Sequence, residues 1–200
     1  LFKKRQKEIK YSIDSWNGNF FIHTNLDAED FKICICKNEN ISKWEDYIPA
    51  MKGVLIGSFD LLNKWMIRSE IRDALPKLYV RNLKTEKEEE LVITSETVIT
   101  PGVSLMQKNR DTNKLYIGYN SPKTPGKSYV YDIVTKEKKL VKEEIVPSGH
   151  QPDDYIVERL NCDSHDGRKI PLTITRHKKT KIDGSANLLL YAYGSYGASM

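Results

Sequence analysis

The sequence is poor in cysteine and contains no long apolar run. Three of its 200 residues are Cys, and they form neither a Cys-x-x-Cys pair nor a Cys/His cluster, so a disulfide framework and a zinc site are not expected. Cys34 and Cys36 lie two apart in a strand-like run and should face the same way as small core residues. This usage favours a reducing compartment, and we expect a cytoplasmic protein. Without an apolar run of membrane-helix length, we expect no membrane partner.

The sequence also lacks a large excess of charge of either sign. Thirty-two Lys and Arg residues against 27 Asp and Glu give a net charge of +5, and the basic runs are mixed with acids or lie beside turns. Solvated strand edges and hairpin tips explain these lysines better than a phosphate-binding stripe, so we expect no nucleic-acid partner. Hydrophobic residues make up 39% of the chain, which is enough for a real core.

Helical periodicity is missing, and short β-rich runs take its place. Strand-like runs begin near Phe20, Trp65 and Lys114, and 50 residues separate Lys64 from Lys114. The same spacing separates Lys77 from Lys127. A sheet unit recurring every 45 to 50 residues is typical of a β-propeller blade, which needs neighbours to bury its faces. We predict about three blades of an incomplete ring; an independent β-sandwich is the alternative.

The character of the chain changes after the repeats. Residues 142–152 carry Pro, Gly and charge without periodicity and are interpreted as a linker. Residues 155–175 then form a predicted hairpin with Asp-Gly at its tip, and Pro171 suggests an edge strand. Residues 187–193 should be a buried strand leading into a Gly-rich loop, where open α/β sheets place their ligand chemistry. Within the repeats, residues 100–104 are expected to form a turn.

The same C-terminal stretch holds the candidates for chemistry. Gly197-Ala198-Ser199-Met200 is part of a nucleophile elbow pattern, but glycines interrupt the chain before Ser199, so a loop is favoured. Tyr193 could aim a phenol at an oxyanion; on spacing alone a core aromatic is favoured. Tyr191 and Tyr196 are expected to pack. The four histidines are expected to be ordinary surface residues: His23, His150, His165 and His177.

Several stretches together resemble the oligopeptidase B branch of the prolyl oligopeptidase family. Residues 190–200 are similar to its Tyr-Gly-Tyr-Gly-Ser-Tyr-Gly stretch, and residues 119–125 are similar to its Tyr-Ser-Ser-x-Thr-Thr-Pro segment. Residues 163–171 resemble its Arg-Asp-Gly-x-x-x-Pro hairpin, and residues 8–25 resemble its approach to a propeller strand. The resemblance therefore spans essentially the whole chain.

The resemblance implies a serine peptidase in which a seven-bladed propeller caps an α/β-hydrolase domain. The substrates would be short peptides, cleaved after Lys or Arg. Tyr193 matches the family's oxyanion donor, with Ala192 in place of the usual Gly, and the catalytic Ser, Asp and His would all lie after residue 200. No metal or other cofactor is implied.

These expectations give a mainly β chain in two parts. Residues 1–147 are predicted to be the C-terminal part of a propeller and residues 148–200 the first strands of a hydrolase domain. The chain would then be an internal fragment that is inactive alone and is completed by the rest of the hydrolase domain. The alternative function is a non-catalytic binding or scaffold remnant, which would self-associate through exposed strand edges.

Overall fold

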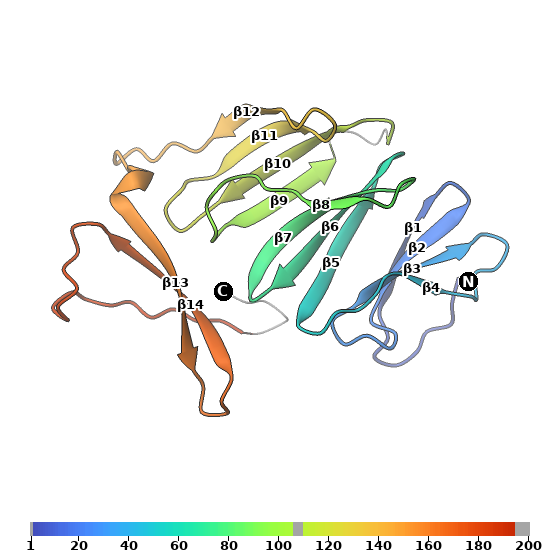
Figure 1. The fold of residues 1–200 in the computed structure, drawn as a ribbon, viewed down its shortest axis with the longest axis horizontal. Helices are drawn as coiled ribbons and strands as arrows, with labels where there is room; N and C mark the ends of the chain where they lie inside the picture. Colours follow the sequence, from blue (N-terminus) through green and yellow to red (C-terminus); the bar gives the residue numbers. More distant parts are fainter. Residues whose placement is uncertain (1, 106–109, 195–200) are drawn as a thin grey trace.

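The fold consists of three similar four-stranded sheets followed by a hairpin. The computed structural model describes residues 2–105 and 110–194. Each sheet is antiparallel and is built from four strands consecutive in the chain, and a separate two-stranded sheet follows. In Figure 1 the sheets lie side by side in chain order, with the middle one between the other two. This is the arrangement of consecutive propeller blades, and the sandwich alternative is wrong.

The three sheets are called blades 1, 2 and 3. Blade 1 comprises β1 (Tyr11–Trp16), β2 (Asn19–Thr24), β3 (Lys32–Lys37) and β4 (Glu45–Ile48). Blade 2 comprises β5 (Val54–Leu61), β6 (Trp65–Arg72), β7 (Leu75–Asn82) and β8 (Glu88–Glu90). Blade 3 comprises β9 (Thr100–Leu105), β10 (Lys114–Asn120), β11 (Lys127–Asp132) and β12 (Lys138–Glu143). The repeated runs in the sequence correspond to the second and third strands of the blades.

The expected turn at residues 100–104 is wrong, because these residues belong to β9. Pro101 lies in this strand and pairs with Tyr119 of β10. Strand β9 is at the edge of its sheet, with β10 as its neighbour in the sheet order. An edge strand tolerates a proline because the missing N–H removes no bond to a second neighbour.

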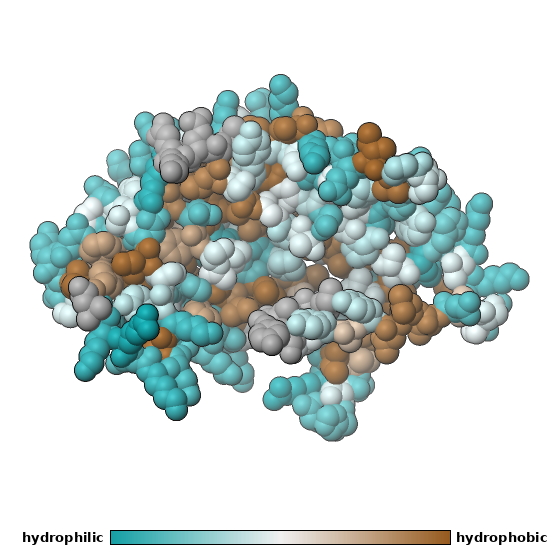
Figure 2. Space-filling view, turned by 180° about the vertical axis from the view of Figure 1, so that it is seen from behind, coloured by the Kyte–Doolittle hydropathy of each residue, from teal (hydrophilic) through white to brown (hydrophobic). Residues whose placement is uncertain are grey.

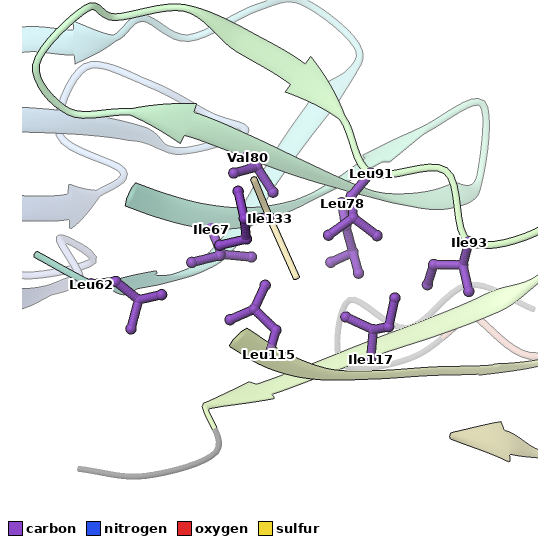
Figure 3. Packing of buried hydrophobic residues seen from close by; sticks show 9 residues of the cluster. All are labelled: Leu62, Ile67, Leu78, Val80, Leu91, Ile93, Leu115, Ile117 and Ile133. Carbon is purple, nitrogen blue, oxygen red and sulfur yellow. The ribbon is translucent and has the colours of Figure 1, made fainter. Parts of the chain in front are cut away.

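Two apolar clusters join the blades. One lies between blades 2 and 3 and consists of nine buried residues, shown in Figure 3: Leu62, Ile67, Leu78, Val80, Leu91, Ile93, Leu115, Ile117 and Ile133. The other lies between blades 1 and 2 and consists of seven: Phe21, Ile33, Ile48, Ile56, Leu61, Met66 and Leu83. Because successive side chains of a strand face opposite ways, the middle blade contributes to both clusters.

The opposite face of blade 1 carries the cysteines. Cys34 and Cys36 are 2% and 4% exposed and pack with Ile22, whereas Ile33 of the same strand packs toward blade 2. The prediction that both cysteines share one face in a core is confirmed. All three cysteines are free thiols.

A hairpin follows the blades. Strand β12 runs to Glu143, so the first two residues of the expected linker are in a strand instead. A short 3-10 helix, η1 (Pro152–Asp154), leads into β13 (Tyr155–Asp163), which pairs with β14 (Lys169–His177). The Asp-Gly tip is as predicted, with Gly167 at a φ of +80° that favours glycine.

The predicted buried strand at residues 187–193 is wrong. These residues have no regular structure, and Leu188, Leu189 and Leu190 are 86%, 88% and 78% exposed. Tyr191, which was expected to pack, is 69% exposed. A buried strand needs neighbours that cover both its edges and its faces, and within the described part of the chain no strand pairs with this segment. Tyr196 and the Gly197-Ala198-Ser199-Met200 pattern lie outside the described residues.

On the face of the molecule seen in Figure 2, hydrophilic residues (teal) surround several separate patches of apolar residues (brown). Across residues 2–105 and 110–194, no helix has the length and hydropathy needed to span a membrane.

Candidate functional site

Tyr193, the predicted oxyanion donor, is half-exposed. Its exposed fraction is 48%, and it follows the exposed run of Leu188 to Tyr191. It is therefore not the core aromatic that spacing alone favoured. Ser199 lies outside the described residues, so the structure does not bring a second candidate catalytic group to Tyr193.

The segment that leads to Tyr193 is attached to one end of the blades. The guanidinium of Arg159 on β13 donates to the carbonyl of Asp73 in the β6–β7 turn. The Nε2–H of His150 donates to the carbonyl of Lys123 in the β10–β11 loop at 2.6 Å. Both acceptors lie at the same end of their blades, since each follows the second strand. We call this end of the blades, which carries the β6–β7 turn and the β10–β11 loop, the hairpin end. Figure 1 shows the hairpin beside it.

Aromatic and ionic contacts hold the base of the hairpin together. The ring of Tyr155 lies 4.9 Å from that of His150 and 5.5 Å from that of His177. Beside it, Lys178 pairs with Asp154 at 2.6 Å. The hairpin therefore leaves the blades from a defined base.

The histidines are less exposed than expected. His23 is half-buried, stacks on Phe31 at 4.6 Å and donates to the carbonyl of Ile56 at 2.8 Å. His150 and His177 are half-buried as well. The surface prediction is correct for His165 and wrong for these three, because each packs against an aromatic ring. The alternation of polar and apolar residues could not reveal these contacts.

The residues that attach the hairpin gave no recognisable sequence signal. Asp73 and Ala74 both adopt positive φ, +49° and +58°, although neither is glycine. Such a turn is usually marked in a sequence by Gly, Asn or Asp, and Ala74 departs from that pattern. Arg159 looks like any solvent-exposed strand residue, so its contact across 86 residues was not foreseeable.

A hollow opens at the hairpin end between blades 2 and 3. It has a volume of about 350 Å³ and is lined by the start of β7 and by the connection from β8 to β9. Glu96 on that connection accepts hydrogen bonds from Ser121 at 2.6 Å and Thr124 at 2.7 Å. These bonds tie the connection to the β10–β11 loop, which also holds His150.

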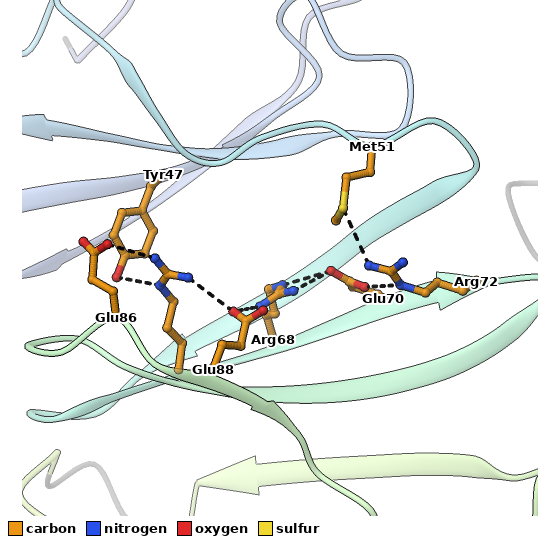
Figure 4. Close-up of polar contacts among 8 residues, drawn as sticks. Tyr47, Met51, Arg68, Glu70, Arg72, Glu86 and Glu88 are labelled. Carbon is orange, nitrogen blue, oxygen red and sulfur yellow. Dashed lines mark hydrogen bonds and ion pairs between the residues drawn. The ribbon is translucent and has the colours of Figure 1, made fainter.

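A buried network of charges lies on the side of blade 2 that faces blade 1 (Figure 4). The carboxylate of Glu70, fully buried, accepts from Arg68 at 2.6 Å and from Arg72 at 2.8 Å. Arg68 also pairs with Glu88, and Arg81 lies 3.8 Å from the same carboxylate. The network reaches blade 1, because the Nε–H of Arg81 donates to the Tyr47 hydroxyl at 3.2 Å. Its charges are paired with one another, so it is a structural network and not an open binding site.

No group of three His, Cys, Asp or Glu side chains in the described ranges is arranged to hold a metal ion. Ser164 Oγ lies 3.4 Å from Nδ1 of its neighbour His165, but His165 is exposed at the hairpin tip. A nucleophile needs a base held in a sheltered site, which this tip does not provide.

Comparison with known families identifies the fold. Residues 1–144 match the family described as the N-terminal β-propeller domain of prolyl oligopeptidase. The chain belongs to the prolyl oligopeptidase family. The matched residues include all three blades, as the repeat in the sequence predicted.

Individual members of the family extend the similarity beyond the blades. Dipeptidyl aminopeptidase BI from Pseudoxanthomonas mexicana is 32% identical over 98% of this chain and 27% of its own length. Protease 2 from Moraxella lacunata is 24% identical over 100% of this chain and 28% of its own. Oligopeptidase B from Trypanosoma brucei, solved with covalently bound antipain, has a TM-score of 0.88 at 26% identity, covering 98% of this chain and 29% of its own. The chain thus spans little more than a quarter of the length of these relatives.

Proposed function

We propose that this chain is part of a serine oligopeptidase that hydrolyses short peptides, with cleavage after Lys or Arg. The observation that carries the proposal is the family match over the three blades, together with similarity to peptidases that continues through the hairpin and the Tyr193 segment. The blades belong to the propeller cap, and the hairpin starts the peptidase domain.

In this mechanism the chain contributes binding geometry and one donor. The Tyr193 hydroxyl and a backbone N–H stabilise the oxyanion that forms when a serine attacks the peptide carbonyl. The nucleophile, the base and its orienting acid are supplied by residues outside positions 1–200. Tyr193 becomes effective when the exposed segment around Leu189 is buried in the sheet of that domain.

The Tyr193 role can be tested in the protein that includes the catalytic domain. Tyr193→Phe should lower kcat about 100-fold or more, equivalent to about 2.7–4 kcal/mol of barrier, with KM little changed. Tyr191→Phe is the matched control and should leave kcat unchanged. Equal kcat for Tyr193→Phe and wild type on a Lys- or Arg-terminated chromogenic peptide would contradict the role.

The 200-residue chain alone is expected to be inactive. Purified chain at high concentration should release no chromophore from the same peptide, because it supplies the donor without the nucleophile. Hydrolysis of the peptide by the isolated chain that persists through two purification schemes would overturn the expected inactivity. We also propose a cytoplasmic location, which the three free cysteines support.

A second candidate, a non-catalytic scaffold, is favoured by one observation. Every residue of β12 is exposed, and the apolar run of Leu188 to Tyr191 is uncovered. Such edges and apolar segments promote association. Light scattering on the purified chain distinguishes the two ideas in part: concentration-dependent self-association supports a scaffold role, and a clean monomer counts against it.

A further inference from the structure

The first turns of the three blades meet at the end of the propeller opposite the hairpin. These turns follow the first strand of each blade, β1, β5 and β9, whereas the turns that hold the hairpin follow the second strand. Consecutive strands are antiparallel, so the two sets of turns lie at opposite ends of the blades. Asp14, Ser15 and Trp16 end β1, Asn63 lies between β5 and β6, and Arg110 lies between β9 and β10. We call these five residues the clasp.

Arg110 of blade 3 reaches across to blade 1. Its Nη2 donates to both carboxylate oxygens of Asp14, at 2.7 Å and 2.9 Å, and its Nη1 donates to the carbonyl of Ser15 at 2.6 Å. Asp14 and Arg110 side chains are about one third exposed, so solvent screens the pair only partly. Because Nη2 donates to the Asp14 carboxylate and Nη1 to the Ser15 carbonyl, these bonds fix the direction of the guanidinium as well as its distance.

Asn63 of blade 2 closes the contact into a ring. Its backbone N–H donates to the carbonyl of Arg110 at 2.8 Å, and its own carbonyl accepts from the indole N–H of Trp16 at 2.9 Å. The path therefore runs from blade 1 through blade 2 to blade 3 and returns to blade 1 through the Arg110 side chain. Each blade holds the other two, whereas the apolar clusters join only neighbouring blades.

We propose that the clasp locks the three blades into one body at this end of the propeller, so that blades 1 and 3 keep a fixed position relative to each other. Three observations support a lock over a chance surface pair. The contact joins residues 95 and 96 positions apart, it uses three donor–acceptor bonds from one side chain, and a backbone bond to Asn63 anchors the same residue.

The three tryptophans provide separate reporters for this proposal. Each indole N–H has a different partner: Trp16 donates to Asn63, Trp44 donates to Ile41 within blade 1, and Trp65 donates to the Asn113 side chain between blades 2 and 3. Hydrogen exchange at each indole can be followed in a spectrum of the ¹⁵N-labelled full chain. The Trp65 bond lies at the same end as the clasp but does not involve the Arg110 side chain, so it reports general loosening.

Arg110→Gln is the deciding variant. We expect the Trp16 indole to exchange about tenfold faster or more, with Trp44 and Trp65 unchanged. Arg110→Lys keeps the charge but has a single donor nitrogen, so its exchange rate at Trp16 should lie between those of wild type and Arg110→Gln. Arg176→Gln removes a comparable pair with Glu158 on the hairpin and should leave all three indoles unchanged.

Two results would overturn the clasp. Unchanged exchange at Trp16 would show that Arg110 does not hold blade 1, and equal acceleration at all three indoles would show a general loss of stability. If Arg110→Gln does not fold, Asp14→Asn decides, because it removes the charge pair and leaves the Ser15 carbonyl in place. Its expected effect is a smaller acceleration confined to Trp16.

Discussion

The two interfaces between blades are built differently. Blades 2 and 3 meet through a cluster of nine buried apolar residues. Blades 1 and 2 share a smaller apolar cluster, and beside it the buried charges of Arg68 and Glu70 contact one another on the same face of β6. The polar contacts between blades 2 and 3, such as the exposed Lys136–Glu89 pair and the Trp65–Asn113 hydrogen bond, lie outside the apolar cluster. On the other face of blade 2 the ion pairs themselves are buried.

The two interfaces differ in what their contacts provide: apolar packing contributes stability, and directed polar contacts fix the relative position of the blades. Apolar burial stabilises an interface roughly in proportion to its area but is non-directional. Buried charges cost desolvation and repay it only when every partner is in place. The Tyr47 hydroxyl of blade 1 accepts a hydrogen bond from Arg81 of blade 2, and the Arg81 guanidinium carbon lies 4.8 Å from the centre of the Tyr47 ring. These directed contacts fix the relative position of blades 1 and 2.

The largest expected effect comes from breaking the network at its centre. Glu70→Ala leaves Arg68 and Arg72 without their common carboxylate in a buried site, and should lower the free energy of unfolding by about 3–5 kcal/mol. Urea denaturation of the purified chain measures the loss. The matched control is the double replacement Arg68→Met with Glu70→Leu, which should cost less than Glu70→Ala. A loss under about 1 kcal/mol for the single variant would show that the network does not hold the interface.

The apolar interface should respond to cavity formation instead. Leu115 is fully buried between blades 2 and 3, so Leu115→Ala should cost about 2–5 kcal/mol. Leu115→Met keeps most of the volume and should cost under about 1.5 kcal/mol. Both values come from urea midpoints. Similar losses for Ala and Met would mean that the cluster is not closely packed.

The sequence predicted the apolar side of this comparison better than the charged side. A repeat of about 50 residues and alternating Ile and Cys residues in β3 were sufficient to predict three blades and which cysteines are buried. Glu70 looked like any charged strand residue, because its burial depends on Arg68 and on blade 1, which local pattern does not encode. The prediction for residues 187–193 was wrong although their local pattern is that of a buried strand, because no described strand pairs with them.

The candidate site was predictable only in part. Tyr193 is singled out by resemblance, and its role as oxyanion donor stays a prediction. In the structure its side chain is half-exposed and follows a segment that pairs with no described strand. Arg159, Asp73 and His150 attach the hairpin through two backbone carbonyls. Carbonyl acceptors exist at every position of a chain, so a sequence cannot indicate which of them is used.

pH offers a further way to distinguish the interfaces, because one carboxyl near blade 1 is unfavourably placed. Burial of Asp60 on β5, followed by the nearby charge of Asp14, raises the pKa of Asp60, and Arg110 opposes this rise. The folded chain thus holds this proton more tightly than the unfolded chain. Asp60 contributes stability below its ordinary pKa of 3.8, and this is lost as pH rises through the raised value.

Asp60→Asn should therefore be more stable than wild type at neutral pH, with the difference disappearing below the ordinary pKa. The control is Asp46 of blade 1, where the hydrogen bond from Lys32 lowers the pKa of the carboxyl. Its contribution is present above the ordinary pKa and is lost as pH falls through the lowered value, so Asp46→Asn should be less stable at neutral pH. Thermal melts from pH 2.5 to 7 measure both, and the same sign for the two variants would contradict the assignment.

The smallest effect is expected at the edge of the charged network. Glu86 accepts from Arg81 at 3.2 Å, but its side chain is 63% exposed. Solvent screens such a pair, so Glu86→Gln should cost about 0.5 kcal/mol or less, and about 0.5 M NaCl should remove the difference. If Glu86→Gln costs as much as Glu70→Ala, the network acts as one cooperative unit from edge to centre. If it costs little, the directed contact between blades 1 and 2 resides in the buried residues of the network.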